Sequence, residues 1–185
     1  MSEANPRTIT VAVAGTFGGQ SRLRLRSMTM PAAVPLERHL VCADPDATAA
    51  LGRALAAAAE AGDLICLWGD LGAGKTWLAK AFGFALGVAE TITSPSFILM
   101  AEYEGRLPLF HIDLYRLADA SDALSGGLID DRQAAGVTLV EWPERLGPAL
   151  PGQRLDVVIA GSGDDPREIT LRAGVPGLRR YLEVA

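Results

Sequence analysis

The sequence predicts an α/β fold, in which an open, mostly parallel β-sheet is flanked by helices in three layers (α/β/α) and ends in a C-terminal β-hairpin. Segments with the composition of strands alternate with segments typical of helices along residues 38–173. A glycine-rich turn joins one strand directly to a helix, and the last two apolar segments flank the turn-forming residues GSGDDP at 161–166. In such open sheets, ligands bind at the carboxyl ends of the strands.

The first half of the predicted domain reads strand, helix, strand, helix. RHLVCA at 38–43 is typical of a strand, and ATAALGRALAAAAEA at 47–61 favours a helix that the preceding Asp-Pro-Asp can cap. The strand DLICLWG follows at 63–69, and the helix KTWLAKAFGFALG begins at residue 75, directly after the glycine-rich turn.

The second half is richer in strands. We predict a short helical tail, PGLRRYLEV at 176–184, after five further strands: SFILMAEY (96–103), PLFHID (108–113), VTLVEW (137–142), RLDVVIA (154–160) and REITLRA (167–173).

The first 35 residues differ in character from the rest. They contain SRLRLRSM and the proline-flanked MPAAVP but no sustained period, so we expect a disordered N-terminal extension ahead of a single domain at residues 36–185. Residues 7–14 imitate a signal peptide, but their apolar part is short and holds two threonines, so we do not expect export.

Composition narrows the class of protein. Cys42 and Cys66 lack the clustered spacing of metal sites and are expected to be reduced and buried. Glu60 and Asp63 interrupt the longest apolar run, so we expect no membrane-spanning helix and a soluble, cytoplasmic protein.

Charge is unevenly distributed. The first 35 residues carry a net charge of +3 and the remainder a net charge of −8. This balance argues against a broad basic groove for nucleic acid on the predicted domain.

Residues 69–76, GDLGAGKT, match the phosphate-binding pattern G-x-x-x-x-G-K-[ST] in the strand–turn–helix context that this motif requires. The glycines let backbone N–H groups turn toward phosphate oxygens, and the helix N-terminus adds its positive dipole end. Lys75, one of only two lysines, is predicted to reach the β and γ phosphates, and Thr76 to offer its hydroxyl to Mg²⁺.

Two other predicted strands end in a carboxylate, at Asp113 and at Glu141. In a nucleotide-hydrolysing sheet such residues lie beside the phosphate loop, where they hold Mg²⁺ or orient the attacking water. The only asparagine is Asn5, so the Asn-Lys-x-Asp motif that selects guanine is missing and ATP is the expected nucleotide.

Three further segments, combined with LWGDLGAGKT, resemble one family: SPSF at 94–97, HIDLYRL at 111–117 and LVEWPERL at 139–146. Together they are similar to the TsaE family (formerly YjeE), bacterial ATPases of tRNA threonylcarbamoyladenosine biosynthesis. The similarity extends from residue 38 to about residue 172 and implies a P-loop NTPase-like fold.

The resemblance implies a set of site residues. Lys75, Asp113 and Glu141 are expected to be catalytic, and Thr76, Glu141 and Asp113 to serve Mg²⁺. Ser96 stands where the family has a threonine near the γ-phosphate. The expected ATP-binding set is Gly69, Asp70, Leu71, Gly72, Ala73, Gly74, Lys75, Thr76, Trp77, Ser96, Arg167, Asp44 and Thr48.

Several of these residues have equally ordinary explanations. Asp44 and Thr48 suit the turn and N-cap of the first helix as well as an adenine contact. Arg167 suits a solvated hairpin arginine.

Four residues near the carboxylates also have open roles. Tyr115 and Arg116 suit a contact with a partner or with the phosphates, and Trp142 suits packing over the site. Tyr115 and Trp142 suit core aromatics equally well. His111 suits a buried histidine whose hydrogen bonds are satisfied.

The resemblance implies an ATPase that acts on the TsaB–TsaD complex, with tRNA held by those partners. A small-molecule kinase shares the phosphate loop, but the stretch between Leu117 and Glu141 holds only Arg132 for a basic lid. A module that binds ATP without hydrolysing it is the third hypothesis. The oligomeric state stays open.

Overall fold

The structure is a computed structural model, and it describes residues 8–17, 20–29, 36–117 and 131–184. The chain divides into two compact units, residues 1–35 and 36–185. No helix among the described residues is long and apolar enough to cross a membrane.

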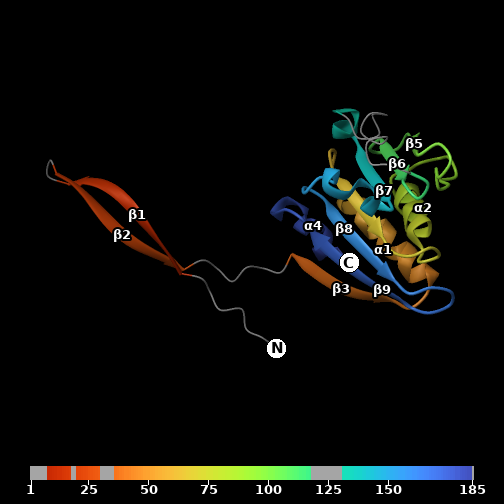
Figure 1. The fold of residues 1–185 in the computed structure, drawn as a ribbon, viewed down its shortest axis with the longest axis horizontal. Helices are drawn as coiled ribbons and strands as arrows, with labels where there is room; N and C mark the ends of the chain where they lie inside the picture. The colour runs from red at the N-terminus through yellow and green to blue at the C-terminus, as the bar shows by residue number, and fades with distance from the viewer. Residues whose placement is uncertain (1–7, 18–19, 30–35, 118–130, 185) are drawn as a thin grey trace. The chain divides into compact units, whose positions relative to one another are not determined.

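The first unit contains an antiparallel pair of strands, β1 (Thr8–Phe17) and β2 (Gln20–Thr29), with Phe17 opposite Gln20 (Figure 1). This differs from the expected extension without regular structure. The alternating residues of RLRLR in β2 have the period of a strand, but this run is too short to form a sustained period.

The second unit is built on a mixed sheet of seven strands, in the order β3-β9-β8-β4-β7-β6-β5 (Figure 1). Strands β8, β4, β7 and β6 run parallel, whereas β3, β9 and β5 run antiparallel to the strands beside them. The strands are β3 (Glu37–Cys42), β4 (Leu64–Trp68), β5 (Met100–Tyr103), β6 (Leu109–Asp113), β7 (Val137–Glu141), β8 (Leu155–Ala160) and β9 (Arg167–Ala173).

Strands β8 and β9 pair antiparallel across the connection at residues 161–166, with Ile159 opposite Ile169. Buried and partly exposed residues alternate along β8, whereas β4, β6 and β7 are buried almost throughout. Continuous burial is typical of parallel strands that are covered on both faces.

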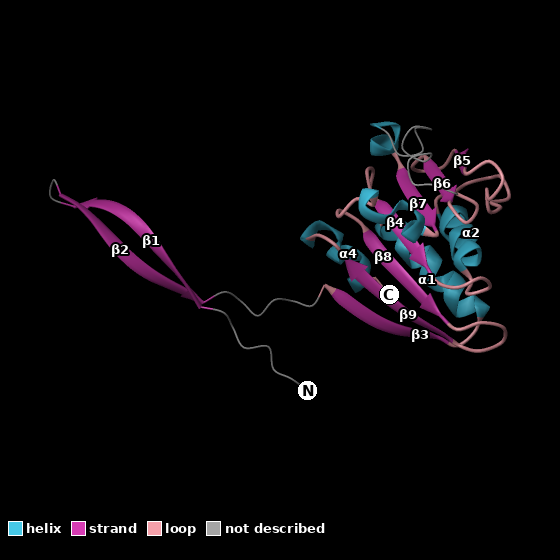
Figure 2. Cartoon of the chain, in the orientation of Figure 1, coloured by secondary structure: helices cyan, strands magenta, loops and turns pink. Residues whose placement is uncertain are grey.

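The helices of this unit are α1 (Pro45–Ala58), α2 (Lys75–Ala85), the 3₁₀ helices η1 (Asp131–Ala135), η2 (Pro143–Ala149) and η3 (Pro176–Arg179), and the short α4 (Arg180–Glu183) (Figure 2). Asp44 caps α1 by accepting a hydrogen bond from the Ala47 backbone N–H at 2.7 Å.

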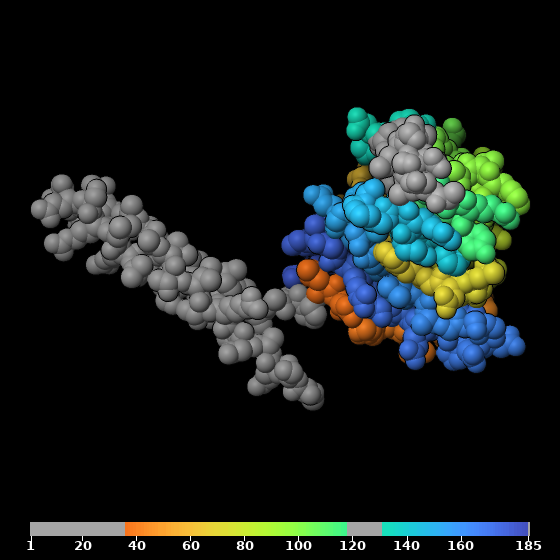
Figure 3. Space-filling view, in the orientation of Figure 1, coloured from red at the N-terminus to blue at the C-terminus, as the bar shows by residue number. Residues whose placement is uncertain are grey.

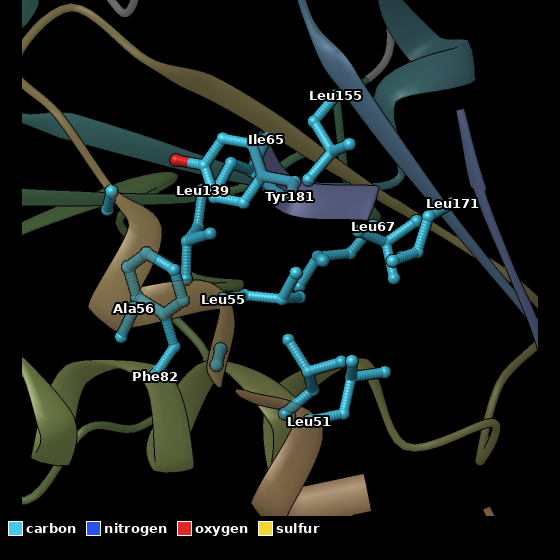
Figure 4. Close-up of a cluster of buried hydrophobic side chains, with 14 of the residues drawn as sticks. Leu51, Leu55, Ala56, Ile65, Leu67, Phe82, Leu139, Leu155, Leu171 and Tyr181 are labelled. Carbon is cyan, nitrogen blue, oxygen red and sulfur yellow. The ribbon is translucent and has the colours of Figure 1, made fainter. Parts of the chain in front are cut away.

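The larger apolar cluster joins α1, α2 and the C-terminal α4 to one face of the sheet. Figure 4 shows Leu55 and Phe82 from the two longer helices beside strand residues and Tyr181. The second cluster, on the other face, includes Cys66, Val140 and Leu146 of η2. Helical segments therefore pack on both faces, although the described cover of the second face is a 3₁₀ helix; residues 118–130 lie outside the described part. Cys42 and Cys66 are free and buried, as predicted.

One predicted strand is shorter than expected. Residues 96–103 were expected to be extended, but β5 begins only at Met100. Ile98 and Leu99 both donate backbone hydrogen bonds to the Pro95 carbonyl, and Leu99 adopts a positive φ of 65°. The preceding residues therefore form a turn, which brings the Ser-Pro-Ser segment back over the end of β6.

Two phenylalanines of α2 provide a matched test of the core. Phe82 is 0% exposed and Phe84 is 74% exposed. Phe82→Ala is expected to lower the free energy of unfolding by about 3–5 kcal/mol, because it leaves a cavity under the sheet. Phe84→Ala should change it by less than about 0.5 kcal/mol. Urea unfolding measures both values, and equal losses would contradict the assigned packing.

Candidate active site

The glycine-rich loop, residues 69–76, joins the carboxyl end of β4 to the first turn of α2. Gly74 occupies the N-cap position of α2 with a φ of 107°, which favours glycine. At Gly69, φ is 142° and an added Cβ would lie 2.4 Å from the Ile159 carbonyl oxygen. Gly69 therefore lets the loop pass closely against β8, whereas Gly74 supplies the left-handed backbone conformation at the start of α2.

Lys75 is almost fully buried at the floor of this loop. Its ammonium group donates hydrogen bonds to the carbonyls of Gly69 at 2.6 Å and Asp70 at 2.9 Å. It also lies 3.8 Å from the ring centroid of Trp142, a cation–π contact. Burial lowers the pKa of Lys75, and the nearby Glu141 carboxylate opposes that shift.

Glu141 and Asp113 are register partners at the ends of the parallel strands β7 and β6. The Thr76 hydroxyl lies 2.9 Å and 3.0 Å from the two oxygens of Glu141, so it donates to that carboxylate. His111 approaches from β6, with Nε2 2.9 Å from Glu141 Oε1. Glu141 and His111 are both buried, so the carboxylate is held between the loop and the sheet.

The expectation that His111 is a satisfied core histidine is therefore only half right. It is fully buried, but its Nε2 contacts Glu141, and its Nδ1 has no hydrogen-bond partner among the residues that the structure describes. The signal for the Glu141 contact was weak, because it depends on the alignment of two strands that are 30 residues apart.

Asp113 is bound by the turn that precedes β5. Its Oδ2 accepts hydrogen bonds from the hydroxyls of Ser94 and, at 2.6 Å, Ser96. Its Oδ1 accepts from the Tyr115 backbone N–H at 2.9 Å. Ser96 was expected at the site, but Ser94 was not singled out, although it stands in the same Ser-Pro-Ser segment.

One hollow beside the loop has a volume of about 260 Å³. It brings together the side chains of Lys75, Thr76, Asp113 and Glu141, with Trp77 at its edge. The loop meets solvent at Leu71, which is 73% exposed, and the yellow part of the chain in Figure 3 is visible at the molecular surface.

A second hollow, of about 440 Å³, shares Gly74 and Trp77 with the first and contains Asp44, Thr48 and Arg167. Asp44 fulfils the capping role that the sequence had left open, whereas the Thr48 hydroxyl donates to the Asp44 carbonyl at 3.3 Å; both residues also line this hollow. The two hollows are therefore adjacent and lie along the same glycine-rich loop.

Arg167 is placed by the turn between β8 and β9. Its Nε donates to the Ala73 carbonyl of the glycine-rich loop at 2.9 Å, and its guanidinium also donates to the Gly163 carbonyl at 2.8 Å. It is therefore attached to the loop and is not a freely solvated hairpin arginine.

Three residues near the carboxylates form aromatic and cation–π contacts. The ring centroids of Tyr115 and Trp142 lie 4.9 Å apart, so Trp142 contacts both Tyr115 and the Lys75 ammonium. Arg116 lies 4.4 Å from the Phe97 ring centroid. Tyr115 is 40% exposed, which excludes a place in the core.

The model of the family described as threonylcarbamoyl adenosine biosynthesis protein TsaE matches residues 42–169. The chain belongs to the TsaE family.

Relatives within the TsaE family share this part of the chain. The TsaE protein of Bacillus subtilis is 45% identical over 131 residues, covering 70% of this chain and 82% of the relative. That of Treponema pallidum is 40% identical over 124 residues, covering 67% and 92%. Both are described as tRNA threonylcarbamoyladenosine biosynthesis proteins. The crystal structure of Bacillus subtilis YdiB superposes with a TM-score of 0.63 at 37% identity, over 80% of this chain and 92% of that one.

Proposed function

We propose that this TsaE-family chain is a P-loop NTPase-like protein that binds ATP with Mg²⁺ and hydrolyses it to ADP and phosphate. The observation that carries the proposal is the meeting of an ammonium, a hydroxyl and two carboxylates in one hollow beside a helix N-terminus. The larger hollow next to it, with Asp44, Thr48 and Arg167, has room for the nucleoside.

The donor set fits Mg²⁺. The Thr76 hydroxyl and the Glu141 carboxylate lie within 3.0 Å of each other and provide the oxygen ligands that this ion prefers. The described residues contain no group of three or more His, Cys, Asp or Glu side chains placed to hold one ion. A bound Mg²⁺ would neutralise charge on the phosphates. Asp113, the other predicted metal residue, lines the same hollow and is proposed to act through water.

The residues then have separate tasks. Backbone N–H groups of the glycine-rich loop cradle the phosphates, and Lys75 exchanges its carbonyl partners for phosphate oxygens and stabilises the charge that develops during transfer. Asp113, oriented by Ser94, Ser96 and the Tyr115 N–H, positions an attacking water in line with the γ-phosphate. His111 and Thr76 hold Glu141 in one orientation.

We further propose that hydrolysis serves a partner complex of TsaB and TsaD in the cytoplasm, and that these partners hold the tRNA. The support is the family, whose curated members are described as tRNA threonylcarbamoyladenosine biosynthesis proteins. The net charge of −8 outside the first 35 residues also suits a protein that reaches tRNA through others.

Reconstitution tests this function. The reaction mixture contains the purified chain, TsaB, TsaD, tRNA, threonylcarbamoyl-adenylate and ATP. We expect it to give several modified tRNAs per complex and to release free phosphate. When the chain is omitted, we expect one modified tRNA per complex or fewer. Transfer of the phosphoryl group to an added nucleoside, with no free phosphate, would support the kinase alternative. Multiple turnover with a non-hydrolysable ATP analogue would support the non-catalytic module.

A further inference from the structure

A third hollow, of about 530 Å³, lies away from the phosphates between α1, α2 and the segment at 88–92. Its floor is apolar and includes Ala81, Val88 and Ile92. Charged residues at its edges are Arg53 on α1, Lys80 on α2 and Glu90 on the following segment. We call this hollow the α1–α2 groove.

Two large aromatic side chains stand at this groove in contact with solvent. Phe84 is 74% exposed and Trp77 is 47% exposed. They are seven residues apart on α2, so they lie on one stripe of the helix about 10 Å apart. Neighbouring exposed aromatics of this size are typical of interaction surfaces.

The two cations of the groove have no charged or hydrogen-bonded partner in the part of the chain that the structure describes. Within the described ranges, neither Arg53 nor Lys80 forms an ion pair or a hydrogen bond, whereas Arg154 and Arg180 both pair with aspartates. They stand out on a unit whose overall charge is negative. An acidic ligand would therefore gain attraction here without displacing an internal partner.

We propose that the α1–α2 groove docks an acidic amphipathic helix of a protein partner. The apolar face of that helix would cover Trp77 and Phe84, and its carboxylates would meet Arg53 and Lys80. The geometry favours protein over nucleic acid, because only two cations are present and Glu90 lies in the same groove. This inference rests on the proposed function, in which the chain works on a protein complex.

Trp77 connects the groove to the nucleotide site. Its side chain lines the groove and both nucleotide hollows, and its Nε1 donates to the Pro45 carbonyl at the start of α1 at 2.8 Å. It directly follows Thr76. A docked helix and a bound nucleotide would thus contact one indole, and any effect of one on the affinity for the other would be reciprocal.

Binding of the purified TsaB–TsaD complex, followed by calorimetry with and without ATP, tests the groove. Phe84→Ala and Lys80→Glu are each expected to weaken binding at least tenfold, the second more at low salt. Val41→Ala is the matched control, because Val41 is 71% exposed on β3, outside the groove, and should leave binding unchanged. All three variants should bind ATP alone like the wild type.

Each other outcome has a distinct meaning. Wild-type affinity in both groove variants would overturn the groove while leaving the proposed function intact. Lys80→Glu could instead lose tRNA binding or self-association while its binding to TsaB–TsaD is unaffected. The first result would assign the groove to nucleic acid and the second to another copy of the chain, and either would overturn the proposal. If the wild type itself failed to bind TsaB–TsaD, the proposed partner and the groove would fall together, and phosphate release alone would still report the ATPase.

Discussion

Lys75→Ala is expected to reduce kcat for ATP hydrolysis by about 10²- to 10³-fold, because it removes a preorganised charge from the phosphate site. Phosphate release under saturating ATP measures this loss, and reconstituted tRNA modification should fall to a single turnover. The fold should survive, since the lost hydrogen bonds join Lys75 only to the Gly69 and Asp70 carbonyls of its own loop.

Two further variants make this result specific. Arg172→Ala removes an exposed cation of β9 that pairs with Glu37 and should leave hydrolysis unchanged. Lys75→Arg should not restore activity, because a guanidinium is larger than the ammonium that lies between the loop carbonyls and the Trp142 ring. If Lys75→Ala released phosphate as fast as the wild type, the proposal that the glycine-rich loop takes part in hydrolysis would be wrong.

Asp113→Asn is expected to lower the rate of hydrolysis by about 10²- to 10⁴-fold while the affinity for ATP changes little. The carboxamide keeps the shape of the side chain but loses the charge that orients the attacking water. Single-turnover hydrolysis and equilibrium binding of a fluorescent ATP analogue separate the two effects.

The control for Asp113→Asn is Glu102→Gln on the adjacent strand β5, where the exposed carboxylate pairs with Arg132. It should hydrolyse ATP like the wild type. If Asp113→Asn retained both hydrolysis and tRNA modification, the residue would have only a structural part, anchoring the Ser94–Ser96 turn. If hydrolysis were lost but modification persisted, ATP binding alone would suffice and the non-catalytic module would be the better description.

Much of the fold was predictable because its signals are local. Short apolar runs bounded by turn residues marked β4, β6 and β7 to within two residues, and the helix after the glycine-rich loop began at Lys75 as predicted. Local signals failed where a tertiary contact decides the backbone. A turn at residues 96–99 replaces the first half of a predicted strand. It forms because backbone N–H groups of the turn donate to the Pro95 carbonyl and because the Ser96 hydroxyl donates to Asp113.

The candidate site was predictable in its parts but not in its connections. Arg167 and Ala73 are 94 residues apart, and no local pattern in the sequence predicts the hydrogen bond between the Arg167 side chain and the Ala73 carbonyl. The same limit applies to the solvent-exposed stripe of Trp77 and Phe84. Their spacing is that of a helix face, and only the packing of α1 against α2 shows which face stays open.

The sequence by itself determined the glycine-rich loop, because the glycines, Lys75 and Thr76 act within one turn and need only the strand before and the helix after them. The family resemblance had assigned Thr76 and Glu141 to one Mg²⁺ site, but only the tertiary structure decided that their side chains contact each other directly across 65 residues and that His111 holds the same carboxylate. The physical reason is the parallel register of β4, β7 and β6, which aligns the ends of strands that are distant in the chain. The choice of which strands pair depends on the free energy of the whole sheet, and the sequence of a single strand does not determine it.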